Sequence, residues 1–317
     1  MEKIQNKKSS DLIRRFGLLF VLLLMVVVMS IVSPVFLKKT NIINVLRQVS
    51  MNGILAVGMT FVILTGGIDL SVGSLVAVTG VIAGNMLQNG RSVPLTLLVS
   101  IGAAVLFGVF NGLQISYAKL PPFIATLASQ TIARGFALAY SDGRPYTIQS
   151  EAYKAVGKGS FIGIPVPVWL MFAVIVIAAV VLSFSTFGRH VYAFGGNRNA
   201  ARLSGLNVRS IELAVYVISA FCAGLAATIL AARISSGQPT AGEGYEFDAI
   251  ASVAIGGTSM SGGVGHLTGT VLGFIFIGVL SNSLTLLNVS SFYQDIVKGF
   301  IIIFAVLMDM RTKRAGK

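Results

Sequence analysis

The chain is poor in the charged residues with which soluble proteins cover their surface. Only 11% of its 317 residues are Asp, Glu, Lys or Arg, while 55% are hydrophobic. Soluble globular domains carry about 25% charged residues, so this composition excludes that class. The sequence indicates an integral membrane protein.

Thiols, imidazoles and catalytic motifs are also scarce. The one cysteine, Cys222, excludes an internal disulfide and any cysteine-based metal cluster. The two histidines, His190 and His266, fall in predicted loops, and the sequence has no G-x-x-x-x-G-K-[ST] phosphate loop, no G-x-S-x-G elbow and no H-E-x-x-H pair. We therefore expect no catalytic residue, no metal and no cofactor bound by this chain. If ATP drives its work, a partner subunit must hydrolyse it.

The formal net charge of +13 has a topological explanation. Lys and Arg occur mostly in the breaks between apolar runs, as the positive-inside rule predicts for a multi-pass membrane protein. A nucleic-acid surface would instead need a basic patch on a soluble domain. The expected surroundings are a lipid bilayer, with no nucleic acid.

Apolar runs give the expected architecture, because about 20 helical residues cross a hydrocarbon core of about 30 Å. The fold class is an all-α, polytopic transmembrane helix bundle of about ten spans, some short or broken, in a single domain of residues 1–317. The ten candidate spans are 16–37, 43–64, 70–87, 93–117, 122–140, 166–186, 210–232, 247–260, 267–287 and 292–309. The eighth is too short to cross without help.

Charge also predicts orientation. With the N-terminus in the cytoplasm, fourteen Lys and Arg side chains lie inside and seven lie outside, which favours cytoplasmic N- and C-termini. Two cytoplasmic tails require an even number of spans, so the eighth segment is expected to cross. This topology makes residues 187–209 a cytoplasmic loop and residues 141–165 the largest external loop, for which a solvated surface is favoured over a docking site.

Residues 187–209 form a basic, Gly-punctuated segment, F-G-R-H-V-Y-A-F-G-G-N-R-N-A-A-R-L-S-G-L-N-V-R, between two apolar runs. Its apolar positions recur at helix-like steps. They are Val191, Phe194, Ala200, Leu203 and Leu206. We expect this segment to face something other than lipid.

A G-G-x-x-x-S-x-G pattern occurs twice, at 66–73 and at 256–263. Paired glycines permit a break in a membrane helix, and transporters use such breaks to build a substrate path. Short turns between helices use Gly and Ser as well, so gate and plain turn remain alternatives. In an inverted repeat matching loops should face opposite sides, whereas this topology places both copies inside.

Ionisable residues in apolar spans are costly and often functional. Arg134 is the foremost candidate, because its span has no acidic residue to pair with it. Lys298 could pair with Asp295 on the same helical face, and Arg47 could snorkel. Asp69, Glu246 and Asp248 lie where helix N-caps are expected. The candidate pathway or gate residues are Gly66, Gly67, Asp69, Ser71, Arg134, Asp248, Gly256, Gly257 and Thr258. Three G-x-x-x-G motifs, at 80–84, 108–112 and 269–273, predict close helix packing.

Four blocks resemble one family. G-R-H-V-Y-A-F-G-G-N at 188–197, continued by A-A-R-L-S-G at 200–205, is similar to the cytoplasmic signature of permease subunits in bacterial ABC importers of simple sugars. G-I-D-L-S-V-G-S at 67–74, Q-P-T-A-G at 238–242 and V-S-S-F-Y-Q at 289–294 match further blocks. The resemblance covers nearly the whole chain.

The resemblance implies a homodimeric permease in the bacterial cell (inner) membrane, served by a cytoplasmic ABC ATPase and an extracytoplasmic sugar-binding protein. It implies inward movement of ribose or another simple sugar by alternating access, with the Gly66 and Gly256 breaks as hinges. Residues 187–209 would be the coupling loop, where Arg198 stands in place of the Glu of many relatives. The ATPase-coupling residues implied are Gly188, Arg189, Ala193, Gly195, Asn197, Ala200, Ala201 and Gly205.

Two other classes remain as alternatives. A secondary transporter driven by protons or sodium would need ionisable groups deep in the bundle, and the spans contain no mid-span acid to carry a proton. A membrane-embedded enzyme would need a nucleophile, base or metal constellation, and the sequence contains none that we recognise.

Overall fold

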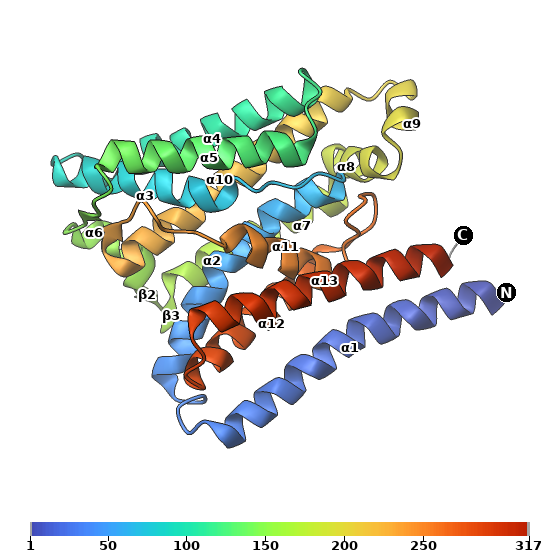
Figure 1. Cartoon of the computed structure of the whole chain (residues 1–317), viewed down its shortest axis with the longest axis horizontal. Helices are drawn as coiled ribbons and strands as arrows, with labels where there is room; N and C mark the ends of the chain where they lie inside the picture. The colour runs from blue at the N-terminus through green and yellow to red at the C-terminus, as the bar shows by residue number, and fades with distance from the viewer. Residues whose placement is uncertain (1, 316–317) are drawn as a thin grey trace.

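A computed structural model describes the backbone of residues 2–315 and the side chains of residues 17–307. The chain is an all-α bundle (Figure 1), as predicted. The long helices are α1 (Glu2–Val32), α2 (Lys39–Leu64), α3 (Val72–Gln88), α4 (Val93–Ser116), α5 (Pro122–Ser141), α7 (Val166–Phe184), α10 (Val208–Ile234), α12 (Leu267–Leu286) and α13 (Ser291–Ala315). The short helices are α6 (Glu151–Lys158), α8 (Thr186–Gly196), α9 (Arg198–Leu203) and α11 (Tyr245–Ile255).

Two small antiparallel pairs complete the described fold. Strand β1 (Tyr146–Thr147) pairs with β4 (Ser236–Gly237), and β2 (Ser160–Phe161) pairs with β3 (Ile164–Pro165). These pairs fold the connections around α6 against the ends of α10 and α7.

Each of the ten apolar segments contains a helix, but their lengths differ. Five helices, α2, α4, α7, α10 and α12, are long and apolar enough by themselves to cross a membrane, while Gly17–Val32 of α1 and helix α3 are shorter apolar stretches. The chain is therefore a multi-pass membrane protein, and the count of ten spans stays a prediction. The basic residues of both tails lie outside the described side chains.

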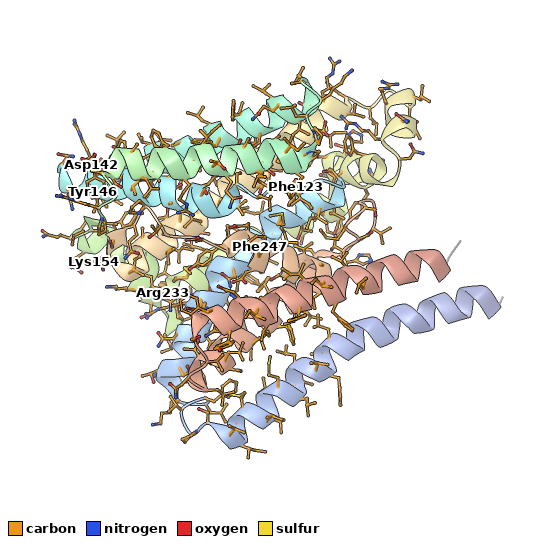
Figure 2. All side chains as sticks on the ribbon, viewed as in Figure 1. Phe123, Asp142, Tyr146, Lys154, Arg233 and Phe247 are labelled. Carbon is orange, nitrogen blue, oxygen red and sulfur yellow. The ribbon has the colours of Figure 1, made fainter. Side chains whose placement is uncertain are left out.

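Contacts between connections define two ends of the bundle. At one, which we call the α6 end, Arg47 in the third turn of α2 donates to the Lys158 carbonyl at 2.6 Å, and Lys158 Nζ donates to Ser235 Oγ at 2.7 Å. At the other, the α8 end, Gly263 N donates to the Leu64 carbonyl at 2.9 Å. Figure 2 shows Asp142, Tyr146, Lys154 and Arg233 gathered at the α6 end.

Two of the crossings combine an extended segment with a shorter helix. After α2 reaches the α8 end, residues 65–71 return into the bundle and α3 continues to the α6 end, where Gln88 Nε2 donates to the Thr147 carbonyl at 3.1 Å. After α10 reaches the α6 end, residues 235–244 return inward and α11 continues to the α8 end. The two units run in opposite directions. The predicted eighth segment does pass between the ends, but its helix has 11 residues, about 16 Å at 1.5 Å per residue, so the extended segment completes the passage.

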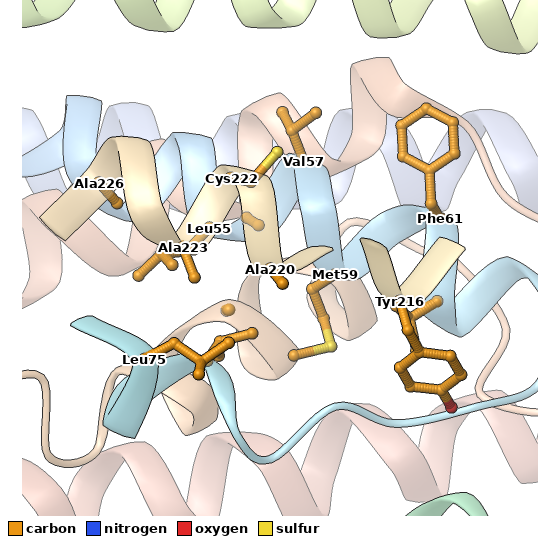
Figure 3. Packing of buried hydrophobic residues seen from close by; sticks show 14 of the residues in the cluster. Leu55, Val57, Met59, Phe61, Leu75, Tyr216, Ala220, Cys222, Ala223 and Ala226 are labelled. Carbon is orange, nitrogen blue, oxygen red and sulfur yellow. The ribbon is translucent and has the colours of Figure 1, made fainter. Parts of the chain in front are cut away.

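Helix α10 lies at the centre of the core and packs against α2, α3 and α4. Figure 3 shows buried residues of α10 with those of α2 and with Leu75 of α3. Small residues allow this approach: a Cβ on Gly58 would lie 2.9 Å from Cys222 Cβ, and one on Gly112 would lie 2.9 Å from Leu213 Cα. The G-x-x-x-G motifs at 108–112 and 269–273 are helix contacts, as predicted, since Gly108 faces α10 and Gly273 faces the Ser252 backbone of α11.

The outer helices present apolar side chains to their surroundings. Leu98, Leu106 and Phe184 are each at least 70% exposed, on α4 and α7, and α1 and α13 also carry long exposed apolar faces. A polypeptide in water would bury such surfaces, whereas hydrocarbon chains are a favourable neighbour for them.

Candidate functional site

The predicted coupling segment folds as two capped helices at the α8 end. Ser185 Oγ accepts from Gly188 N at 3.0 Å and begins α8, and Asn197 Oδ1 accepts from Ala200 N at 2.9 Å and begins α9. Gly205 ends α9 with φ +83°, a left-handed conformation that glycine adopts without cost. The Ser and Asn caps explain why this segment is helical between two turns.

The two helices have distinct buried and exposed faces. Gly188, Val191, Phe194 and Ala201 are buried, and Gly195 is half-buried. Arg189, Ala193, Asn197 and Ala200 are exposed, and Leu203 is 83% exposed. The apolar positions recur at helix-like steps, but only Val191 and Phe194 among them lie on the buried face. The extended backbone of Asn197, with φ −160° and ψ 102°, resets the helix direction, so Ala200 and Leu203 are exposed.

The inner face of α8 meets two other connections with backbone against backbone. A Cβ on Gly195 would collide with the Leu64 carbonyl oxygen and with Gly263 N. Gly66 and Gly262 are also in close approach, since a Cβ on Gly262 would lie 2.7 Å from Gly66 N. We call this contact of α8 with residues 64–66 and 261–263 the glycine junction. Both copies of the G-G-x-x-x-S-x-G pattern thus reach the same end, as the predicted topology required.

A side-chain bond ties α8 to the same turn. Tyr192 Oη donates to the Gly265 carbonyl at 3.0 Å, and Phe187 stacks on Phe61 of α2 with ring centroids 6.5 Å apart. Burial raises the pKa of the Tyr192 phenol above its ordinary value. The phenol therefore keeps its proton and remains a donor throughout the physiological range.

Arg198, which stands where the resemblance led us to expect Glu, is held in place. Its Nη2 donates to Glu212 Oε2 at 2.7 Å, and its guanidinium lies 5.3 Å from the centroid of the Phe194 ring. Glu212 is 4% exposed on α10. The pair links α9 to the central helix.

Asp69 is fully buried in the extended segment 65–71. Its Oδ1 accepts from Ser71 N at 3.0 Å and from Ser71 Oγ at 2.6 Å, while its Oδ2 accepts from Ser219 Oγ on α10 at 2.8 Å. Asn111 of α4 donates to Ser71 Oγ at 2.9 Å. The N-cap prediction for Asp69 is wrong, because α3 begins after Ser71 and no side chain caps it. The carboxylate instead fastens the extended segment to α10.

Arg134 holds the other extended segment. Its Nη1 donates to the carbonyls of Pro239 at 2.7 Å and Ala241 at 2.9 Å. One turn earlier on α5, Gln130 Nε2 donates to Glu246 Oε1 at 3.0 Å. An arginine deep in a span thus satisfies backbone carbonyls that have no helical partner.

Asp248 binds the last helix. Lys298 Nζ lies 2.9 Å from Asp248 Oδ1 and 3.9 Å from Asp295 Oδ1. The predicted pair with Asp295 is therefore the longer and more exposed one. The cap predictions for Glu246 and Asp248 are wrong, since Gly244 precedes α11 and no side chain caps it.

Gly256, Gly257 and Thr258 form the turn after α11. Gly256 packs on the Gly269 backbone, and Gly257 adopts φ +88°. Thr258 is 1% exposed, and a Cβ on Gly265 would lie 2.6 Å from its Oγ1. These residues end a helix tightly against α12 and lead into the glycine junction.

The predicted residues therefore fall into groups rather than one site. Gly66, Gly67, Gly195 and the 256–263 turn gather at the α8 end, where a Cβ on Gly67 would collide with the Tyr216 hydroxyl. Asp69, Ser71, Arg134 and Asp248 hold the two extended segments and α11. Sequence reasoning missed Tyr192, Leu203, Glu212 and Ser219 as functional candidates. Among the described residues, no group of three or more His, Cys, Asp or Glu could hold a metal ion.

Comparison with known proteins gives the family. Residues 41–306 match the family model described as branched-chain amino acid transport system / permease component. The ribose import permease protein RbsC of Bacillus subtilis is 46% identical over 98% of each chain, and that of Haemophilus influenzae is 43% identical over 96% of this chain and 97% of the relative. The L-arabinose transport system permease protein AraH of Escherichia coli is 35% identical over 96% of this chain and 92% of the relative. No solved structure matches the chain. The chain belongs to this family of membrane permease components, whose relatives here are transport subunits rather than enzymes.

Proposed function

We propose that this chain is the membrane permease subunit of an ABC importer that brings ribose into the cytoplasm. A separate cytoplasmic ATPase docks on α8 and α9, and an extracytoplasmic binding protein delivers the sugar at the α6 end. The permease acts as a homodimer, with both termini in the cytoplasm. The ribose and arabinose permeases that it resembles support a pentose, and the higher identity to the ribose permeases supports ribose.

One observation carries the docking role: the α8–α9 pair is exposed on one side and locked into the bundle on the other. Its exposed side offers Arg189, Ala193 and Leu203. Leu203 is 83% exposed on a short cytoplasmic helix, and full burial of a leucine side chain against a partner contributes about 1.5–3 kcal/mol. The buried side makes the backbone contacts of the glycine junction, so movement of the docked helices is transmitted inward.

The transmission reaches the extended segment 65–71 and helix α11. Residues 64–66 of the glycine junction overlap the start of the extended segment 65–71, which Asp69 fastens to α10. The turn at 261–263 leads back to α11, which contacts α5 through Glu246 and α13 through Asp248. Close-packed elements shift between discrete arrangements rather than deforming smoothly. A pull on α8 therefore displaces 65–71 and α11 together, and these two segments move the barrier to the sugar.

Reconstitution tests the energy source. The chain, its ATPase and its binding protein are placed in proteoliposomes, and uptake of labelled ribose is followed with ATP present and ion gradients collapsed. We expect uptake to continue, to stop without ATP or without the ATPase, and to be competed better by ribose than by arabinose. Uptake by the permease alone that an ionophore abolishes would establish the secondary-transporter alternative instead.

The docking role has its own test. Leu203→Asp places a charge in the expected contact, and loss of a buried anchor of this kind costs about 2 kcal/mol, or roughly 30-fold in affinity. Ile162→Asp is the matched control, because Ile162 is 78% exposed at the α6 end. We expect ATPase co-purification to fail for the first variant only. Equal co-purification of both variants would show that α9 is not the docking helix.

A further inference from the structure

A basic pocket lies beside the coupling helices, between the α4–α5 turn and α9. Its cavity volume is about 360 Å³. Four cationic side chains line it, Lys119, Arg198, Arg202 and Arg209. Among the ion pairs of the described residues, only the pair of Arg198 with Glu212 involves the pocket. Positive charge is therefore in large excess.

The fold places the four cationic residues in different ways. Arg209 lies over the Tyr117 ring, 5.3 Å from its centroid, and Arg198 is held by Glu212. Lys119 sits in the turn with φ +60°, a left-handed conformation that costs a non-glycine residue about 1–2 kcal/mol. Arg202 projects from the last turn of α9. The turn thus has a lysine at a position where glycine would adopt the same backbone conformation without this cost.

The remaining wall of the pocket is mostly apolar. Ile115, Leu120, Pro121, Pro122 and Val208 form most of it, where α4 ends and α5 begins, and Ser116 and Asn199 are its two polar uncharged members. The exposed apolar faces of both helices continue from this wall, with Phe123 54% and Ile124 55% exposed. Phe123 is labelled in Figure 2, on the α5 turn nearest this end. An occupant that fits must carry negative charge at one end and hydrocarbon at the other.

We propose that this pocket binds the phosphate headgroup of an anionic phospholipid of the cytoplasmic leaflet, with an acyl chain lying along α4 and α5. Basic pockets between spans on the cytoplasmic side suit such headgroups. A free phosphate would use the cations and leave the apolar wall unused, whereas an acidic partner protein would not need a pocket at the hydrocarbon boundary. Since α9 forms one wall, a bound lipid braces the helix on which the ATPase is proposed to dock.

Native mass spectrometry of the full chain in detergent tests this site. Retention of phosphatidylglycerol is compared with retention of phosphatidylcholine for the wild type, Lys119→Gln, Arg202→Gln and the double variant. Each cation near a membrane surface is worth about fivefold in binding, so we expect roughly 25-fold weaker phosphatidylglycerol binding for the double variant. The charge-conserving Arg202→Lys should keep most of the binding. Arg144→Gln, an exposed residue at the α6 end, is the matched control and should bind as the wild type does.

Three outcomes would overturn the proposal. Equal retention of phosphatidylglycerol by the double variant and the control would place the lipid elsewhere. Displacement of the lipid by millimolar inorganic phosphate would identify a free anion site. Unchanged lipid binding with loss of ATPase co-purification in the double variant would assign the cations to the protein partner. Loss of lipid binding in the double variant supports the lipid site whether ribose transport is abolished or intact. The transport function proposed above is tested separately by reconstitution.

Discussion

The sharpest prediction concerns two neighbouring glycines at the end of α8. A methyl group on Gly195 would collide with the Leu64 carbonyl and the Gly263 amide, whereas the same methyl on Gly196 would meet nothing within 4 Å. Gly195→Ala and Gly196→Ala therefore make the same chemical change one residue apart, in opposite surroundings. Any general effect of alanine on the helix is shared by both.

The expected difference can be worked from the contacts. Replacing a helical glycine by alanine without a clash is worth up to about 1 kcal/mol. Overpacking costs about 1–3 kcal/mol, towards the upper end for Gly195, because both contacting atoms belong to backbone that cannot rotate away. The 2.9 Å bond from Gly263 N to the Leu64 carbonyl lies at the clash and contributes about 1 kcal/mol more if broken. The two variants should differ by roughly 2–4 kcal/mol in unfolding free energy.

Two measurements check this reasoning. Denaturant titration of the purified permease in mixed micelles should show Gly195→Ala destabilised and Gly196→Ala unchanged or stabilised. Sugar-stimulated ATP hydrolysis by the reconstituted transporter should fall at least about tenfold for Gly195→Ala, which corresponds to 1.4 kcal/mol. Equal stability of the two variants would refute the backbone contact. If Gly195→Ala lost stability but kept full sugar-stimulated ATP hydrolysis, the glycine junction would serve packing alone and would not transmit movement.

Two ion pairs give further predictions. Arg198→Glu and Glu212→Arg should each destabilise α9 by about 1–3 kcal/mol, as expected for loss of a charged hydrogen bond, and should therefore weaken ATPase co-purification. The double variant with both substitutions should recover most of the co-purification. A double variant that fails to recover it would show that Arg198 contacts the ATPase directly. Lys298→Met leaves Asp248 buried without its cation, which costs about 3–5 kcal/mol, while the double variant with Asp248→Leu should be closer to wild type in denaturant titration. Additive losses in that double variant would argue that the pair does not hold α13 to α11.

Much of the fold could be predicted because it rests on local composition. Each of the ten apolar segments contains a helix, and the glycine pair at 66–67 does lie in the non-helical segment between α2 and α3. The caps were harder to predict. Asp69 and Asp248 have the residue type of an N-cap, but each has a partner far away in the sequence, Ser219 for Asp69 and Lys298 for Asp248. A carboxylate takes the strongest donor that packing brings to it, and spacing along one helix does not reveal that donor.

The coupling segment shows the same division. The amino-acid sequence alone indicated its position between spans, its basic charge and its resemblance to a family block. Its outward face was not, because the turn at Asn197 changes the helix direction and leaves Leu203 exposed. A single backbone dihedral outside the helical range is enough to break a periodicity argument.

The sequence by itself determined the class of protein, the family and the approximate position of each apolar helix, because hydropathy, charge and glycine content act over neighbouring residues. Only the tertiary structure decided what those features contact: the meeting of Gly195 with residues 64 and 263, the pairing of Arg198 with Glu212, and the gathering of four cations around one pocket. The physical reason is that close backbone approach and paired charge depend on helices distant in sequence sharing one volume. Their order along the chain does not encode that distance in any local pattern.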